Sequence, residues 1–225
     1  MFYDSTFIIL IPAMIFALYA QGRISSTFNK YLRIRGTYGY RGYEVARKIL
    51  DSNGLYDIPI EQIRGSLTDH YDPRKRVLRL SRDVYEGTSI ASAGVAAHEC
   101  GHALQHSEGY APLVVRNAIA PIAAIGSQAA MFFIIIALIL NAMHIFTLGI
   151  YLFSAAVIFQ IITLPVEFNA SSRAIVALQG YNLLSPGEEE GAKKVLSAAA
   201  LTYVAGTVMA ISQLLRLLLI RGRRD

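Results

Sequence analysis

One uncharged stretch, residues 118–164, decides the class of fold and reads AIAPIAAIGSQAAMFFIIIALILNAMHIFTLGIYLFSAAVIFQIITL. It contains no Asp, Glu, Lys or Arg, and a short turn at 141–144 divides it into two apolar halves. Each half is about as long as the ~20 residues that a helix needs to cross about 30 Å of hydrocarbon. We therefore predict a transmembrane hairpin, at 118–140 and 145–164, whose outer ends lie on the same side of a membrane.

The composition of the whole chain agrees with a membrane protein. Of its 225 residues, 54% are hydrophobic and only 16% are charged, which is a more apolar balance than soluble domains have. The charges crowd between Arg23 and Arg116, and this indicates one polar insert. We assign the net charge of +5 to the cytoplasmic flanks of membrane helices, so no nucleic-acid partner is predicted. The single cysteine, Cys100, excludes an internal disulfide.

A first membrane span is predicted near the N-terminus, where Phe7 to Ala20 carries no charge. The segment lacks the basic start and the cleavage site of a signal peptide, so a retained anchor is expected. Basic residues then outnumber acids before residue 51: Arg23, Lys30, Arg33, Arg35, Arg41, Arg47 and Lys48 against Glu44. By the positive-inside rule this side faces the cytoplasm and the N-terminus faces out.

The insert shows helix and strand signals. A helix is predicted from Arg41 to Ser52, closed by Asn53-Gly54. A turn is predicted at 71–74, followed by a short strand at 77–81 that pairs with the preceding segment. Thr88 or Ser89 is expected to cap a helix that ends near Gly109, with Pro112 as a further stop signal.

The C-terminal part leaves the number of spans open. Pro165 at a first helical position predicts a new helix from Val166 through Leu178, ended by Gly180. A capping box at 185–188 opens a final helix. Residues 195–215 are apolar enough to cross, but a fourth crossing would place Arg221, Arg223 and Arg224 outside, against the positive-inside rule.

The chemistry is carried by HECGH at positions 98 to 102, which matches H-E-x-x-H within a helical pattern. On a helix His102 lies about 40° around and one turn along from His98, so both imidazoles can bind one ion. Glu99 lies beside them, where it can take a proton from water without being a ligand. With this composition a chance match is expected in roughly 0.4% of chains. The alternative is a purely structural role, in which the motif lies in a core helix with two hydrogen-bonded polar residues.

A catalytic zinc ion needs a third protein ligand and one open position. His106 is about 12 Å along the helix from His98 and is expected to orient a ligand or to face solvent. Glu167 is the only acid between Glu108 and Glu188, and it follows the third apolar span on the side predicted for HECGH. An unpaired carboxylate at that depth is costly, so we predict Glu167 as the third ligand. The alternative is an interfacial carboxylate in a first helical turn.

HECGHALQH, followed after the hairpin by LPVEFNASSRA, resembles the bacterial YugP-like neutral zinc metallopeptidases over nearly the whole chain. It is similar, more distantly, to the HtpX-like membrane gluzincins, whose two ligand helices are also separated by membrane spans. The resemblance implies His98, His102 and Glu167 as ligands and Glu99 as base. The distant group has an acid where Ser171 stands here, so Asn169 or Ser171 is expected to orient a ligand histidine instead.

One further cation near the site is open to two interpretations. Arg173 follows Glu167 by six residues, and it either stabilises the oxyanion of the reaction or anchors lipid phosphates.

Together these inferences predict a mainly α, integral membrane fold with three to four transmembrane helices and a small cytoplasmic α+β zincin-like insert. Its parts are expected to be an N-terminal transmembrane anchor (1–21), the cytoplasmic insert with the HECGH helix (22–117), the transmembrane hairpin (118–165), the helix with the third ligand (166–185) and a C-terminal membrane-associated or transmembrane helix (186–225).

The predicted function is a Zn²⁺-dependent metalloendopeptidase of the cell (inner) membrane, with its active site facing the cytoplasm. Its expected partners are the bilayer and peptide or membrane-protein substrates, and a homo-oligomer or a membrane partner protein stays open. The rival hypothesis is a non-catalytic zinc-binding membrane scaffold, against which the presence of Glu99 argues. Transport is disfavoured because HECGH precedes the second span and Glu167 follows the third.

Overall fold

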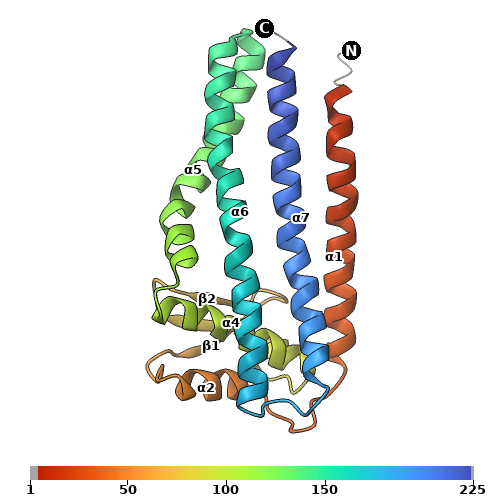
Figure 1. Cartoon of the computed structure of the whole chain (residues 1–225), viewed down its shortest axis with the longest axis vertical. Coiled ribbons are helices and arrows are strands. Elements are labelled where there is room, and N and C mark those ends of the chain that lie inside the picture. Colours follow the sequence, from red (N-terminus) through yellow and green to blue (C-terminus); the bar gives the residue numbers. More distant parts are fainter. Residues whose placement is uncertain (1–4, 224–225) are drawn as a thin grey trace. The chain divides into compact units, whose positions relative to one another are not determined.

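The computed structural model describes residues 5–223, so Arg224 lies outside the described residues. The chain is mainly helical and contains one small sheet (Figure 1). The elements are a 3-10 helix at Ser5–Ile9, then α1 (Leu10–Leu32), α2 (Gly42–Ser52), β1 (Ile60–Ile63), β2 (His70–Asp72), β3 (Val77–Ser81), α3 (Arg82–Tyr85), α4 (Ile90–Ser107), α5 (Ala111–Leu140), α6 (Met143–Gly180) and α7 (Glu189–Gly222).

Four helical stretches within residues 5–223 are long and apolar enough to cross a membrane. They are Ser5–Leu32, Ala111–Leu140, Met143–Gly180 and Glu189–Gly222. The predicted hairpin is confirmed, with α5 and α6 joined at Asn141, which adopts a positive φ of 52°. The C-terminal helix α7 is the fourth candidate span by its length and composition.

One predicted helix boundary at a proline is wrong: Pro165 does not begin a helix but lies inside α6. The predicted end of the HECGH helix near Gly109 is confirmed, because α4 ends at Ser107, Gly109 has a φ of 64°, and Pro112 lies beyond this end in the first turn of α5. A proline in a helix interior removes one backbone hydrogen bond. In an apolar span a continuous helix still pairs the other backbone groups, which a break would expose to hydrocarbon. The prediction therefore gave too much weight to proline as a boundary signal.

The chain forms two compact units, and α1, α6 and α7 each contribute residues to both. The helical unit comprises Met1–Gln21, Ala111–Pro165 and Thr202–Asp225. Its core forms around Phe146 and Ile150 of α6, which pack with Ile134 of α5 and Leu217 of α7.

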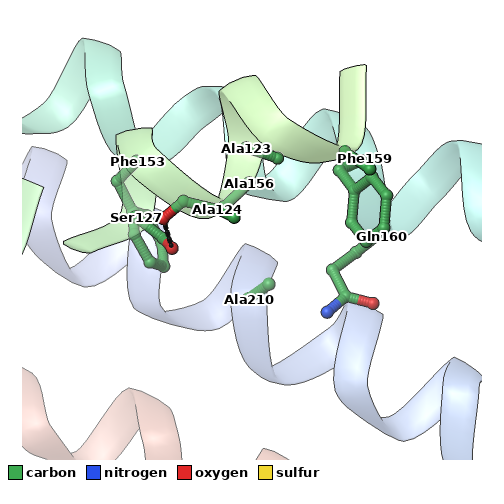
Figure 2. Close-up of a pocket in the computed structure, with 9 residues that line it drawn as sticks. Ala123, Ala124, Ser127, Phe153, Ala156, Phe159, Gln160 and Ala210 are labelled. Carbon is green, nitrogen blue, oxygen red and sulfur yellow. Dashed lines mark hydrogen bonds between the residues drawn. The ribbon is translucent and has the colours of Figure 1, made fainter. Parts of the chain in front are cut away.

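Small residues on α5 have two different roles in the helical unit. Ala130 is fully buried, whereas Ala120, Ala124 and Ser127 line a pocket of about 400 Å³. Figure 2 shows this pocket, with Phe153, Phe159 and Gln160 of α6 and Ala210 of α7 among its lining residues. The small side chains of α5 thus serve close packing at one position and border a hollow at others.

The mixed unit comprises Gly22–Tyr110 and Val166–Leu201 and holds the sheet. Its strand order is β1-β3-β2, with β3 parallel to β1 and antiparallel to β2. The predicted strand at 77–81 is confirmed as β3, and its central position leaves it no free edge. β1 was not predicted, and the turn expected at 71–74 lies instead at 73–76, because Tyr71 and Asp72 belong to β2.

The core of the mixed unit joins α2, β3 and α4. Ile49 and Leu50 of α2 and Leu78 and Leu80 of β3 are fully buried and share one apolar cluster with the small residues of α4. The predicted helix at 41–52 is confirmed as α2, and Gly54 beyond it has a φ of 74°. This core carries α4, and with it the HECGH motif.

Candidate metal centre

The HECGH motif lies in the middle of α4, as predicted from the sequence. Ser89 is the N-cap of this helix, and its hydroxyl accepts a hydrogen bond from the Ser92 N–H at 3.0 Å. Ala96, Ala97 and Cys100 are fully buried in the core. Because these small residues anchor one side of the helix, the histidines of the motif face the other side.

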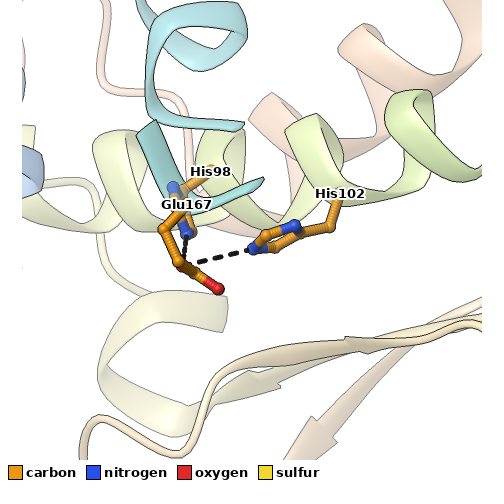
Figure 3. Close-up of side chains that lie close together, drawn as sticks. All are labelled: His98, His102 and Glu167. Carbon is orange, nitrogen blue, oxygen red and sulfur yellow. Dashed lines mark ion pairs between the residues drawn. The ribbon is translucent and has the colours of Figure 1, made fainter. Parts of the chain in front are cut away.

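His98, His102 and Glu167 come together at one point (Figure 3). Glu167 Oε2 lies 3.4 Å from His98 Nε2 and 3.6 Å from His102 Nε2. Two ligands of a tetrahedral zinc ion, each about 2.0–2.1 Å from the metal, are about 3.3 Å apart. The observed spacing therefore suits a zinc ion, as do the chemical types of the three donors. The Glu167 side chain is only 4% exposed.

Close contact between α4 and α6 makes this convergence possible. A Cβ atom at Gly101 would lie 2.5 Å from the backbone oxygen of Ala170. Only glycine leaves room for α6 to approach this near to the motif. Close packing of the two helices therefore requires glycine at position 101, although H-E-x-x-H allows any residue there. Glu167 lies one helical turn before Ala170 on α6, so the same close approach brings Glu167 near the motif.

Each histidine is held through its other ring nitrogen. His98 Nδ1 contacts the Ser171 hydroxyl at 3.2 Å, and His102 Nδ1 contacts Gln105 Oε1 at 3.0 Å. Metal-binding histidines commonly have such a partner, which fixes the ring and directs the remaining nitrogen at the ion. Here both Nε2 atoms are directed at Glu167.

The charge state of His102 reflects two opposing effects. Burial disfavours its charged form, but the nearby carboxylates of Glu167 and Glu99 outweigh burial and raise the pKa of His102. The two carboxylates thus place negative charge beside the ring of His102.

Glu99 is buried on α4 but does not belong to the cluster of three donors. Its Oε2 accepts a hydrogen bond from the backbone N–H of Tyr71 in β2 at 2.9 Å. The pKa of the neighbouring Asp69 is raised, mainly by burial and to a lesser extent by the negative charge of Glu99. Hydrogen bonds from Ser81 lower this pKa but do not cancel the rise. One oxygen of Glu99 is thus fixed by the sheet.

The remaining predicted site residues do not touch the three donor atoms. His106 Nδ1 lies 2.9 Å from the Tyr71 hydroxyl, one turn beyond His102. Asn169 Oδ1 accepts from Gln105 Nε2 at 2.9 Å and from Arg173 Nε at 2.8 Å. The Arg173 guanidinium also pairs with Glu108 at 2.7 Å. Arg173 therefore links α6 to the end of α4.

Sequence reasoning missed Gln105 and Tyr71. Gln105 lies three residues after His102, and residues at that spacing share a helix face, so its contact with a ligand could have been inferred. No comparable signal pointed to Tyr71, because its contact with Glu99 is made by the backbone and depends on where β2 lies.

The sequence profile of a family described as "Putative neutral zinc metallopeptidase" matches residues 6–222 of the chain. The chain belongs to this family. It is also 50% identical over 210 residues to the "Putative membrane protease YugP" of Bacillus subtilis (strain 168), and the match covers 93% of each protein. No solved structure matches the chain.

Membership of the zinc metallopeptidase family agrees with the donor set seen here. Two imidazole nitrogens and one carboxylate oxygen form a common ligand set of catalytic zinc sites. The relative is described as a membrane protease, and the four apolar helices of this chain make it a membrane protein as well.

Proposed function

We propose that this protein is a zinc metalloendopeptidase in which His98, His102 and Glu167 hold the metal and Glu99 is the general base. The observation that carries the proposal is the spacing of 3.4 and 3.6 Å between the Glu167 carboxylate and the two imidazole nitrogens. Membership of the zinc metallopeptidase family supports the choice of metal and of reaction class.

A zinc ion supplies Lewis-acid polarisation of the scissile carbonyl and lowers the pKa of water to about 7. The contribution of Glu99 follows from its surroundings. Tyr71 N–H holds Oε2, so Oε1 accepts the proton of the attacking water and later passes it to the leaving amine. Ser171 and Gln105 keep the ligand rings in place throughout.

The proposed substrates are membrane-associated proteins, and the proposed location of the site is the cytoplasmic face of the cell (inner) membrane. Seven Lys and Arg residues and only one acid lie between residues 21 and 50, which supports a cytoplasmic mixed unit. Four crossings then place Arg221 and Arg223 outside. These two arginines oppose the positive-inside rule, but the seven basic residues between residues 21 and 50 outnumber them.

Glu99→Gln tests the catalytic part of the proposal. Zinc content and cleavage of casein or of a membrane-protein substrate are measured in parallel on the purified protein. We expect zinc to be kept and cleavage to be lost, because the amide cannot accept the proton. Glu190→Gln, the same change at an exposed glutamate, is the matched control and should cleave as the wild type does.

The outcomes separate the two hypotheses on function. Equal cleavage by Glu99→Gln and the wild type would reject Glu99 as the base. Zinc binding by the wild type without any cleavage would favour the non-catalytic scaffold. Reporter fusions at residues 60 and 225 test the topology, and the proposal expects a cytoplasmic signal from the first and an external signal from the second.

A further inference from the structure

Gln105 is completely buried and contacts both helices that supply the proposed metal ligands. Its Oε1 lies 3.0 Å from His102 Nδ1 on α4. Its Nε2 lies 2.8 Å from the backbone oxygen of Val166 and 2.9 Å from Asn169 Oδ1, both on α6. A buried amide with all these contacts has one orientation open to it, and that orientation can be worked out.

The orientation follows from groups that can act in only one way. The backbone oxygen of Val166 only accepts hydrogen bonds, so the nitrogen of the Gln105 amide must face it. The Arg173 Nε only donates, so it fixes Asn169 Oδ1 as an acceptor, and this oxygen also requires the nitrogen of Gln105. Two independent contacts therefore turn the Gln105 oxygen towards His102.

The orientation of Gln105 in turn decides the tautomer of His102. An amide oxygen cannot donate, so His102 Nδ1 must carry the hydrogen of this contact. In the neutral ring Nε2 is then unprotonated, with its lone pair directed at the point where Glu167 Oε2 lies 3.6 Å away. The hydrogen on Nδ1 thus leaves Nε2 as the nitrogen that would bind a metal ion.

The same side chain also ties α6 in place beside the third ligand. Val166 directly precedes Glu167 in the chain, and its carbonyl is the acceptor of the Gln105 amide. One turn further along, the Arg173 guanidinium pairs with Glu108 at the end of α4. A continuous path of contacts therefore runs from Glu108 through Arg173, Asn169 and Gln105 to His102.

We propose that Gln105 is a positioning residue that holds His102 in the Nδ1–H tautomer and so sets the metal affinity of the site. The inference rests on the proposed function, because it takes His102 as a metal ligand. Loss of such a partner of a ligand histidine typically weakens metal binding by about 10- to 100-fold.

Gln105→Met removes both hydrogen-bonding functions at similar side-chain length. The zinc affinity of the purified protein is measured by competition with a chromogenic chelator. We expect Gln105→Met to bind zinc about 10- to 100-fold more weakly than the wild type. Gln179→Met, the same change at an exposed position of α6, should leave the affinity unchanged. Wild-type affinity in Gln105→Met would overturn the inference.

Gln105→Glu separates orientation of the histidine from helix packing. The carboxylate still accepts from His102 Nδ1–H but cannot donate to Val166. We expect it to bind zinc at least about tenfold more tightly than Gln105→Met, although its melting temperature falls. Equal losses in both variants would mean a packing role only and would overturn the inference.

Misfolding of a variant and absence of zinc binding in the wild type have different meanings. If Gln105→Met fails to fold, Gln105→Glu is compared with the wild type, and a folded protein that has lost zinc would reject the inference. The amide ¹⁵N spectrum of each purified variant reports folding independently of metal. Absence of zinc binding in the wild type would instead reject the proposed function, so the two failures are distinguishable.

Discussion

Gly101→Ala is expected to weaken zinc binding by forcing α4 and α6 apart. The added methyl group would lie 2.5 Å from the backbone oxygen of Ala170, whereas ordinary contact begins at 3.4 Å. The helices must therefore separate by about 0.9 Å along this line, since well-packed interiors have little free space. The gaps of 3.4 and 3.6 Å from Glu167 to the two histidines then widen beyond the spacing that one zinc ion spans.

The size of the effect follows from the cost of overpacking. Forcing an extra methyl group into a packed contact costs about 1–3 kcal/mol. If zinc binding must restore the close approach, its affinity falls by about 5- to 160-fold. Chelator competition measures this change, with Gly180→Ala as control because a Cβ there meets nothing within 4 Å. A folded Gly101→Ala protein that binds zinc as tightly as the wild type would refute the reasoning.

Three other changes test separate parts of the account. Glu167→Ala should reduce the zinc content of the purified protein, because it removes a proposed ligand. Glu190→Ala, the control, should not. Unchanged zinc content in Glu167→Ala would exclude Glu167 as a ligand. The hydrogen bond from Arg173 lowers the pKa of Glu108, so this pair stabilises the fold above about pH 4.3 and loses its effect as the pH falls through the lowered pKa. Glu108→Gln should therefore lower the melting temperature at pH 7 but not near about pH 3, and a pH-independent difference would contradict this sign. Ser89→Ala removes the N-cap of α4 and should destabilise the protein by about 1 kcal/mol, measured by chemical denaturation; no change would show that the cap is dispensable.

Much of the fold could be predicted because long apolar runs and local caps carry it. The hairpin was predicted from the length of its uncharged stretches. The glycine after α2 and the serine before α4 indicated where these helices end and begin, and the apolar residues at 77–81 indicated β3. β1 and β2 were missed because each has only a few residues, and their pairing with β3 depends on contacts distant in sequence. The boundary at Pro165 was wrong because the apolar surroundings of a span favour a continuous helix over a break.

The candidate site could be predicted as a set of residue types but not as a network. Helical spacing places His98 and His102 together, and the scarcity of acids singled out Glu167. The structure brings their donor atoms to one point, and their role as ligands stays a proposal. The contacts of Gln105 with Val166 and of Tyr71 with Glu99 use backbone groups. Sequence alone does not place such groups, so these contacts needed coordinates.

Zinc-edge X-ray absorption of the purified, zinc-loaded protein tests the central claim most directly. The account predicts two imidazole nitrogens at about 2.0–2.1 Å and carboxylate oxygen at about 2.0–2.2 Å, with the oxygen contribution reduced in Glu167→Ala. It predicts no sulfur, because the Cys100 thiol is buried, contacts the backbone oxygen of Ala46, and has a pKa raised by burial. A sulfur ligand at about 2.3 Å, or a single imidazole, would contradict the proposed site.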